Sequence, residues 1–319
     1  MFNLAILGAG RIAHTMAKTV RELEEVSLYA VAARDKHRAQ KFAEEYGVEK
    51  FYGTYEEMVK DPEIDLVYIA TTHNLHAQHM KLCIAHGKNV LCEKSFVMNA
   101  VEAEEVFSLA KEKNVFVCEA MWTRFLPIKN RVINTLHSGI IGELKSMRVD
   151  FCTNIMYKER MVSRELGGGA LLDLGIYCLT AAAMLFGHDV AEFENTAVLT
   201  GDGVDLSDEM VLRFTDGRTA NLMCAMDREA PSQIYVYGED GYMAIKNLTN
   251  WQKASFYHKG GECIKEIVCP PQISGYEYEV LAAKEAIENG QRECTQMPHA
   301  ETLRMMEWMD ILRETEAEE

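Results

Sequence analysis

The sequence predicts an α/β protein with two domains, the first built on a doubly wound parallel sheet and the second an α+β region with a largely antiparallel sheet. The chain has 319 residues, which is too long for one typical hydrophobic core. Up to about residue 120, nearly continuous apolar strand segments alternate with helical patterns, as in a parallel sheet covered on both faces. After that point, strand segments follow one another through tight turns, which is typical of antiparallel pairing.

The first domain is expected to span residues 1–120 and to alternate five strands with helices. Its strand segments are LAILGAG, SLYAVAA, DLVYIAT, NVLCE and NVFVCEA. Helices are expected at 11–24, 36–46, 75–86 and 99–113, where the pattern has helical rather than strand spacing. Because a helix crosses over between successive strands, these strands are expected to run in parallel.

The second domain is expected to span residues 121–319 and to combine strands with flanking helices. A helix near 125–138 opens it, and helices return near 275–289 and 299–316. The strand segments between them are LKSMRVDFCT, EFENTAVLT, EMVLRFTDG, RTANLMCAM, SQIYVYGEDG, YMAIKN and ASFYHK. The turns TDGR and GEDGY are hairpin signals, so neighbouring strands here are expected to pair antiparallel.

Several strands of the second sheet are apolar on both sides, so one face needs cover beyond the sheet's own helices. The segment SQIYVYG, for example, places Tyr235 and Val236 on opposite faces. We expect an open face that a second copy covers through twofold symmetry, which makes the protein a homodimer or a higher homo-oligomer. The alternative is that the C-terminal helices cover this face within one chain.

Composition excludes two classes of partner. The chain is 48% hydrophobic and 26% charged, and 33 basic against 49 acidic residues give a net charge of −16. This charge argues against nucleic acid and against anionic membrane surfaces, so any anionic ligand needs a local basic site. Nine cysteines without metal or disulfide spacing indicate reduced thiols. With no long apolar run and an N-terminus that opens into a strand, a cytoplasmic protein is expected.

The segment GAGRIA predicts a dinucleotide site. Gly8 permits a tight turn after the first strand, Gly10 lets the backbone approach a pyrophosphate, and Ala13 lets helix and strand pack closely. Arg11 and Ile12 lie in the first helical turn, whose N-terminus then faces the phosphates. Because the motif follows a strand and opens a helix, it has the context of a Rossmann domain.

The end of the second strand bears on the choice of cofactor. An NAD site commonly has an acidic residue at this tip, whereas here the tip reads Ala33-Arg34. Arg34, with Arg38 one turn later, can hold a 2′-phosphate, so NADP is preferred and NAD stays possible. Asp35 comes one position late and suits an N-cap of the next helix. If Asp35 instead points inward, the preference reverses.

Glu93 and Lys94 lie at the carboxyl end of the apolar strand NVLCE. Open α/β sheets bind ligands at the carboxyl ends of their strands. A Glu-Lys-Pro tripeptide at this place is the hallmark of the Gfo/Idh/MocA oxidoreductases, and the sequence resembles that family. It reads Glu93-Lys94-Ser95, so serine replaces the usual proline while the lysine that points to substrate is kept. The alternative is that Glu93 and Lys94 form an incidental ion pair on the protein surface.

A second motif supports the same resemblance. In GGGALLDLGIYC, the i, i+4 spacing of Asp173 and Tyr177 puts both side chains on one face of a helix. Most of the family has Asp-x-x-x-His there. The tyrosine form is similar to glucose-fructose oxidoreductase and to the dimeric dihydrodiol dehydrogenases, and MWTRF resembles the latter. The resemblance covers essentially the whole chain and leaves the substrate open.

In carbonyl reduction, the nicotinamide delivers a hydride to the carbonyl carbon and an alkoxide develops on the oxygen. A proton donor is needed beside that oxygen. A free tyrosine has a pKa of about 10, which a nearby Lys94 cation would lower. Tyr177 is therefore the expected acid/base, Lys94 its electrostatic partner, and Asp173 a ligand of a substrate hydroxyl or a group that orients Lys94. The alternative is a structural ion pair and a core tyrosine.

The remaining site residues are assigned by the resemblance. It implies that His76 lines the nicotinamide pocket, against surface exposure, and that Thr71 and Glu93 also belong to the cofactor site. Trp122 and Arg124 are expected to wall the substrate pocket, although Trp122 equally suits interdomain packing. His73, His76 and His79 recur every three residues, but no carboxylate is near in sequence and no metal site is expected.

The resulting hypothesis is an NADP-preferring oxidoreductase that transfers hydride between nicotinamide and a carbonyl or hydroxyl of a small sugar, polyol, diol or dicarbonyl. One alternative is an NAD-linked sugar or inositol dehydrogenase. The other, from a different class, is a dinucleotide-binding sensor without turnover. The intact Lys94, Asp173 and Tyr177 argue against the sensor.

Overall fold

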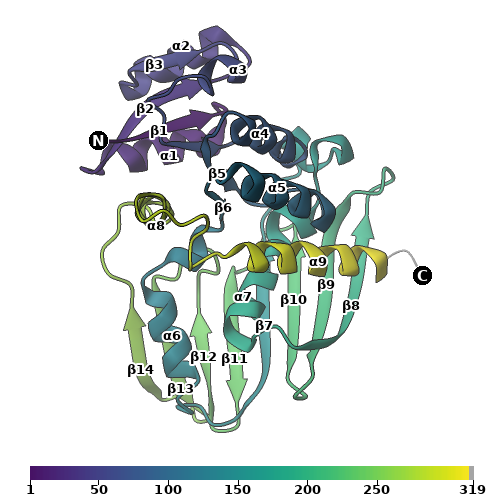
Figure 1. Ribbon diagram of the computed structural model, residues 1–319. Coiled ribbons are helices and arrows are strands. Elements are labelled where there is room, and N and C mark those ends of the chain that lie inside the picture. The colour runs from purple at the N-terminus through teal and green to yellow at the C-terminus, as the bar shows by residue number, and fades with distance from the viewer. Residues whose placement is uncertain (316–319) are drawn as a thin grey trace. The chain divides into compact units, whose positions relative to one another are not determined.

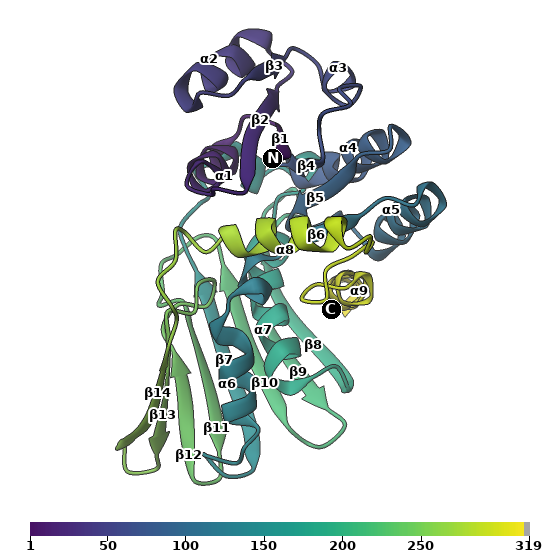
Figure 2. The same cartoon turned by 60° about the vertical axis from the view of Figure 1, so that its left-hand side comes forward.

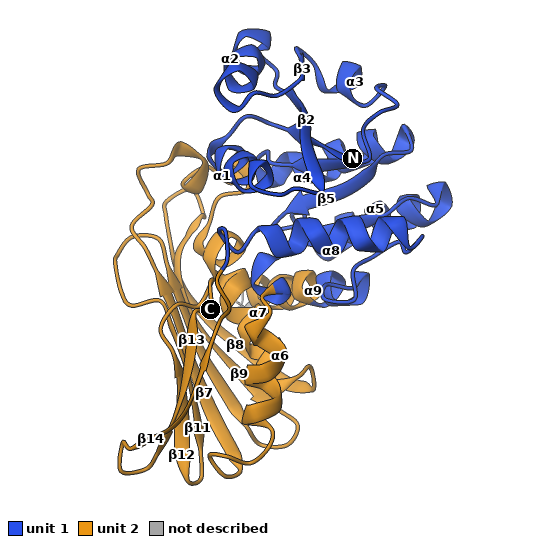
Figure 3. Ribbon diagram, turned by 90° about the vertical axis from the view of Figure 1, so that its left-hand side faces the viewer, with its two compact units in different colours: residues 1–125, 272–304 blue, residues 126–271, 305–319 orange. Residues whose placement is uncertain are grey.

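The computed structural model describes residues 1–315, and the packing divides the chain into two compact units (Figure 3). Unit 1 contains Met1–Phe125 and Gln272–Arg304, and unit 2 contains Leu126–Pro271 and the chain from Met305 onward. The sequence pattern suggests one boundary near residue 120. The return of Gln272–Arg304 to unit 1 has no counterpart in that pattern, because an apolar helix face does not show which core it joins.

Unit 1 is built on six parallel strands in the order β3-β2-β1-β4-β5-β6. In that order the strands are Lys50–Tyr52, Val26–Ala32, Phe2–Leu7, Leu66–Ile69, Asn89–Glu93 and Val117–Ala120. The strand order reverses between β1 and β4, which is the switch point where sheets of this kind bind ligands. The expected doubly wound parallel sheet is confirmed.

The helices of unit 1 pack in pairs on the sheet. Helices α1 (Arg11–Arg21) and α2 (Lys36–Tyr46) contact each other, as do α4 (His73–Ala85) and α5 (Ala100–Lys113), and the two pairs lie on opposite faces (Figure 2). Shorter elements are α3 (Tyr55–Met58) and η1 (Trp122–Phe125). Helix α8 (Glu277–Glu288) contacts β5 and η1.

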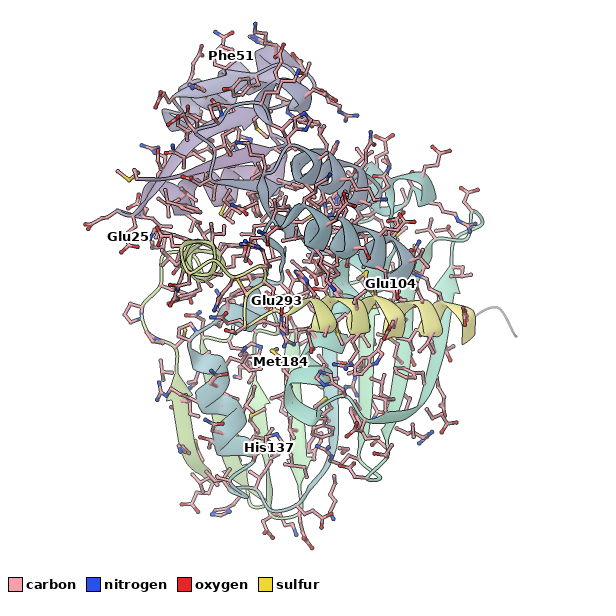
Figure 4. The ribbon with its side chains drawn as sticks, in the orientation of Figure 1. Glu25, Phe51, Glu104, His137, Met184 and Glu293 are labelled. Atoms are coloured by element: carbon pink, nitrogen blue, oxygen red, sulfur yellow. The ribbon has the colours of Figure 1, made fainter. Side chains whose placement is uncertain are left out.

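Strand β3 is the one element of this sheet that the sequence did not predict. It has only three residues, KFY, none of them fully buried. Phe51, labelled in Figure 4, is 37% exposed on this edge strand. A short, exposed edge strand lacks the apolar run by which buried parallel strands are identified.

Unit 2 contains an eight-stranded mixed sheet in the order β14-β13-β12-β11-β7-β10-β9-β8 (Figure 1). In chain order, β7 to β14 are Leu144–Cys152, Val190–Leu199, Asp205–Phe214, Thr219–Ala225, Gln233–Gly238, Gly241–Ile245, Lys253–His258 and Cys263–Val268. All neighbours pair antiparallel except β7 and β10, which are parallel. The largely antiparallel sheet is confirmed, and β14 adds an edge strand that the sequence did not predict.

Helices cover one face of this sheet. Helix α6 (Ile128–Leu136) contacts β14, and α7 (Ile176–Phe186) contacts β7 and β10. Figures 1 and 2 show both on the same face, and within the described part of unit 2 no helix covers the other. Short turns, η2 (Glu159–Met161) and η3 (Arg164–Leu166), precede a π-helical turn, η4 (Leu171–Gly175), that runs into α7. The last helix, α9 (His299–Thr315), crosses from unit 1 into unit 2.

One segment, Arg164–Phe186, is long and apolar enough to span a membrane, but 94% of its most apolar stretch is buried inside the protein. It is therefore a core helix of unit 2. All nine cysteines are free thiols, and all except Cys263 are buried. This confirms the expectation of reduced cysteines that pack as small apolar side chains.

Candidate active site

The glycine-rich turn after β1 passes close to the turn after β4. Gly8 has a φ of +102°, and a β-carbon there would lie 2.9 Å from the carbonyl oxygen of Ala70. Gly10 precedes α1, and that helix has no side-chain cap. Its first backbone N–H groups therefore remain available to an anion. Ala13 is fully buried against the sheet, so all three positions suit a dinucleotide phosphate site.

Two exposed arginines follow β2 and differ in their contacts: Arg34 lies between the strand and α2, and Arg38 lies in the first turn of α2. The Arg38 guanidinium donates through Nε and Nη2 to the carbonyl oxygen of Ala9, at 3.1 and 2.6 Å, and so is tied to the glycine turn. Arg34 is exposed just beyond the strand. Asp35 is also exposed and caps α2 by accepting from the backbone N–H of His37 at 2.9 Å. The N-cap role expected for Asp35 is confirmed.

The carboxyl end of β5 is a buried polar site. Glu93 is only 7% exposed and accepts a hydrogen bond from the hydroxyl of Tyr68, which is fully buried on the neighbouring strand β4. Burial, and then the Glu93 carboxylate, raise the pKa of Tyr68 well above its usual value. Lys94 follows half-buried, and the peptide bond between Lys94 and Ser95 is cis. Glu93 is thus a hydrogen-bonded core carboxylate rather than half of a surface ion pair.

His76 joins the segments that follow β4 and β5. Its ring is fully buried, with Nδ1 2.9 Å from the carbonyl oxygen of Ser95 and Nε2 3.2 Å from that of Thr71. Burial lowers the pKa of His76 to about 4, so the ring is neutral at neutral pH and donates to one of these carbonyls at a time. The alternative of surface exposure is wrong.

Two further histidines flank this site. His73 is 5% exposed, and His79 contacts the Thr71 hydroxyl through Nδ1 at 3.0 Å. Burial lowers the pKa of His79 to about 4 as well. Within residues 1–315, no group of three or more His, Cys, Asp or Glu side chains is placed to hold a metal ion.

Trp122 and Arg124 are both packed within unit 1. The Trp122 ring stacks on Tyr276 with the ring centroids 4.3 Å apart. Arg124 donates to the carboxylate of Glu301 at 2.7 Å and to the carbonyl of Gln296 at 2.9 Å. The side chains of this ion pair are only 12% and 5% exposed. A direct substrate contact by either residue stays a prediction.

Asp173 and Tyr177 belong to unit 2 and to one continuous helix. Asp173 lies in the π-helical turn η4, Tyr177 follows in α7, and they are 6% and 7% exposed. Arg160 from η2 forms an ion pair with Asp173 at 3.3 Å. Tyr177 packs its ring edge-to-face with Phe151 of β7. The two predicted catalytic residues of this unit are therefore brought onto one buried helix beside a cation.

Two regions of the chain match one family. Residues 2–121 match the oxidoreductase family with an NAD-binding Rossmann fold, and residues 130–244 match the GFO/IDH/MocA C-terminal domain. The chain belongs to the Gfo/Idh/MocA oxidoreductase family. The resemblance carried by Glu93-Lys94-Ser95 and by the Asp173–Tyr177 helix is confirmed.

Curated relatives of this Gfo/Idh/MocA protein match over nearly the full length. The trans-1,2-dihydrobenzene-1,2-diol dehydrogenase of Danio rerio is 33% identical over 317 residues, and that of Mus musculus is 33% identical over 321. In both cases the match covers 97% of this chain and 95% of the relative. The protein is an NAD(P)-dependent oxidoreductase of the dihydrodiol dehydrogenase and sugar oxidoreductase kind.

Solved structures share the fold at lower identity. A 3-ketoreductase from Actinomadura kijaniata in complex with NADP and TDP-benzene aligns with a TM-score of 0.90 at 23% identity, covering 98% of this chain and 97% of that one. Levoglucosan dehydrogenase in complex with NADH and L-sorbose aligns with a TM-score of 0.85 at 17% identity, covering 99% and 96%. These likenesses support the two-domain family fold.

Three side chains that contact or lie near the predicted site residues were not predicted from the sequence. Arg160 reaches Asp173 from the short turn η2, which lies outside the sequence motif. Tyr68 carried a weak signal, because a lone hydroxyl inside an apolar strand needs a buried partner. Glu279 on α8 is fully buried near Glu93, and no motif in that helix marks it.

Proposed function

We propose that this enzyme transfers hydride between NADP and the CH–OH or carbonyl carbon of a small diol, sugar, polyol or dicarbonyl. The observation that carries the proposal is the buried helix of unit 2, which presents Asp173 and Tyr177 on consecutive turns beside Arg160. A buried hydroxyl at that position is a proton donor shielded from water. The substrate class follows from the diol dehydrogenases that the chain resembles over its full length.

The chain's residues suit the cofactor. The uncapped N-terminus of α1 and the open approach at Gly10, where a β-carbon's nearest neighbour would be 3.5 Å away, fit a pyrophosphate. Arg34 and Arg38 favour NADP, and Asp35, engaged as an N-cap, gives no support to the reversed preference. When bound, the dinucleotide donates or accepts the hydride.

The protein's own part is to manage protons and charge. Tyr177 donates a proton to the substrate oxygen during reduction and removes it during oxidation. The ammonium of Lys94 stabilises the charge that develops on that oxygen. Arg160 balances the charge of Asp173, which leaves the carboxylate as an acceptor for a neighbouring substrate hydroxyl.

We also propose a cytoplasmic homodimer.

The test is a substrate panel of trans-dihydrodiols, sugars, polyols and dicarbonyls, followed by nicotinamide absorbance with NADP and with NAD. Turnover of a diol or sugar with NADP is expected. Preference for NAD with inositols or sugars would select the NAD-linked alternative. Nucleotide binding without turnover of any panel member would select the sensor.

The first prediction concerns Tyr177→Phe, which removes only the hydroxyl. Turnover is expected to fall by about 10²- to 10⁴-fold, the usual scale for a positioned acid or base, while NADP affinity stays unchanged. Steady-state kinetics and cofactor titration measure both quantities. Near-normal turnover would remove Tyr177 from the mechanism.

A further inference from the structure

Two aspartates at the start of β9 lie beside the helix that carries Asp173 and Tyr177. In the pairing of β8 with β9, Val198 faces Ser207 and Leu199 faces Asp205, so Leu206 is an extra residue in β9. Without such a bulge, Asp205 and Asp208, three positions apart, would face opposite sides of the sheet. A bulge can re-aim a side chain, and bulges are common beside active sites.

Asp205 contacts the first turn of the helix that carries Asp173 and Tyr177. Its Oδ2 accepts a hydrogen bond from the backbone N–H of Leu171, the first residue of the π-helical turn, at 2.6 Å. Gly169, just before this turn, has a φ of +126°, and a β-carbon there would collide with the Asp205 carboxylate. A buried N–H at a helix start needs an acceptor, and a carboxylate at that end is also favoured by the helix dipole.

Asp208 continues the same network. It is fully buried and accepts from the side-chain amide of Asn195 at 3.0 Å and from the thiol of Cys224 at 3.4 Å. Cys224 touches the far end of the π-helical turn, because a β-carbon at Gly175 would lie 3.1 Å from its Sγ. The network thus contacts the turn at both of its ends, Leu171 and Gly175.

Asp205 is half-buried and Asp208 fully buried, and the two carboxyl groups also interact with each other. Burial raises the pKa of Asp205, although the N–H of Leu171, Asp208 and the Arg313 cation act in the opposite direction. The interaction with Asp208 ties the Asp205 side chain to the interior of the sheet as well as to the helix. The turn is then fixed to the sheet rather than left to its own hydrogen bonds.

We propose that Asp205 and Asp208 form a positioning pair that holds the π-helical turn so that Asp173 and Tyr177 project in the reactive geometry. This inference rests on the proposed function of those two residues. π-Helical turns occur often at functional sites, and the network explains what keeps this one in place. In this arrangement both aspartates act through the helix rather than on the substrate.

The experiment compares Asp205→Asn, Asp205→Ala and the exposed control Asp202→Ala. Asparagine keeps an acceptor oxygen for Leu171 and a donor for Asp208, so kcat is expected within about threefold of the wild type. Alanine removes the acceptor and is expected to lower kcat by about 10- to 100-fold, the scale of a displaced catalytic group. The Kd for NADP should stay unchanged in all three.

Combination with Tyr177→Phe separates positioning from general destabilisation. If Asp205 acts through Tyr177, Asp205→Ala should cost little in the Tyr177→Phe background, because groups that work as a unit are not additive. An undiminished cost there, or a loss in Asp205→Asn as large as in alanine, overturns the inference. Should Asp205→Ala fail to fold, Asp205→Ser, which cannot reach Leu171, takes its place.

The two proposals fail in different ways. Normal kcat in Asp205→Ala alongside an inactive Tyr177→Phe rejects the positioning pair and leaves the proposed function intact. Near-normal turnover in Tyr177→Phe rejects the proposed function itself. Circular dichroism at the assay temperature shows whether each variant is folded under the conditions of the kinetic comparison. Thermal unfolding curves show whether its midpoint lies above that temperature.

Discussion

Glu279 shows how strongly a single buried side chain can couple stability to pH. It is fully buried on α8, and neither of its carboxylate oxygens has a hydrogen-bond partner among the described residues. Burial, and then the charge of Glu93, raise the pKa of Glu279 well above its usual value. The side chain is therefore protonated in the folded protein at a pH where an unfolded glutamate is ionised.

The second prediction follows from the sign of this shift. Because the folded state keeps the Glu279 proton, its stabilising effect is complete below the unfolded pKa of about 4.3 and is lost as pH rises through the raised value. Glu279→Gln removes this dependence. Relative to wild type, its free energy of unfolding should rise between pH 5 and pH 8 by up to ~1.4 kcal/mol per pH unit.

Urea unfolding of both proteins at several pH values measures this difference. The exposed Glu285 lies on the same helix, so Glu285→Gln is the matched control and should follow the wild type. Parallel curves for wild type and Glu279→Gln would show that Glu279 is already ionised in the folded protein.

The third prediction concerns the choice of cofactor by Arg34. Arg38 already donates to Ala9, so Arg34 is the better placed of the two to read a 2′-phosphate. Arg34→Ala should weaken NADP by ~1.5–3 kcal/mol, the value of a charge-assisted hydrogen bond, and weaken NAD far less. Cofactor titrations measure both affinities, with Lys41→Ala, an exposed lysine of the neighbouring helix α2, as control. Equal losses for the two cofactors would show that Arg34 does not contact the extra phosphate.

At the scale of elements, the turn between β1 and α1 needs a glycine for its backbone conformation and is also the proposed phosphate site of the dinucleotide. Gly8 has both a positive φ and a close approach to the Ala70 carbonyl, whereas Gly47, at the end of α2, has a φ of +66° and no atom within 4 Å of an added β-carbon. A substitution at Gly47 therefore introduces backbone strain alone, whereas a substitution at Gly8 adds a steric collision with Ala70.

The fourth prediction compares Gly8→Ala with Gly47→Ala. Both should lose stability, by roughly 1–2 kcal/mol for the left-handed backbone alone. Only Gly8→Ala should also lose NADP affinity, by at least about tenfold, because the glycine turn must move away from Ala70 and with it the phosphate site. Thermal unfolding and cofactor titration distinguish these effects. Normal NADP binding by Gly8→Ala would contradict the role of this contact.

The pattern of elements also shows how far sequence reasoning reaches. The buried strands β1, β2, β4, β5 and β6 were predicted because apolar runs between helices mark them. The edge strands β3 and β14 were not, because they are exposed and lack that signal. The parallel pairing of β7 with β10 joins segments about 70 residues apart, which local hairpin signals do not encode.

The candidate site divides in the same way. Gly8, Glu93, Lys94, Asp173 and Tyr177 were predicted as site residues because each stands in a local motif. Their partners were not, since Tyr68, Arg160 and Asp205 meet the motif residues only through folding. Sequence motifs therefore indicate the candidate reacting groups, and the contacts that set the orientation and charge of these groups require the structure.

At the scale of the whole molecule, the open face of the unit 2 sheet carries a cluster of aromatic side chains. Four tyrosines contact one another in sequence across β11, β12 and β13: Tyr235, Tyr237, Tyr242 and Tyr257. Tyr237 is 41% exposed, and the other three are partly exposed. Tyrosine is enriched at protein interfaces, where its ring is buried and its hydroxyl finds a partner.

The fifth prediction is that this tyrosine cluster forms the interface of a homodimer. Closed twofold symmetry lets one patch cover its twin, so sedimentation equilibrium at micromolar concentration should give about twice the chain mass of 36.1 kDa. Replacing Tyr237 and Tyr242 together by glutamate places like charges across the twofold axis and should yield the monomer. Phe51→Glu, at a 37% exposed edge position of unit 1, should stay dimeric. A wild-type mass of 36.1 kDa contradicts the dimer, whereas a dimer that survives the double substitution moves the interface to another surface.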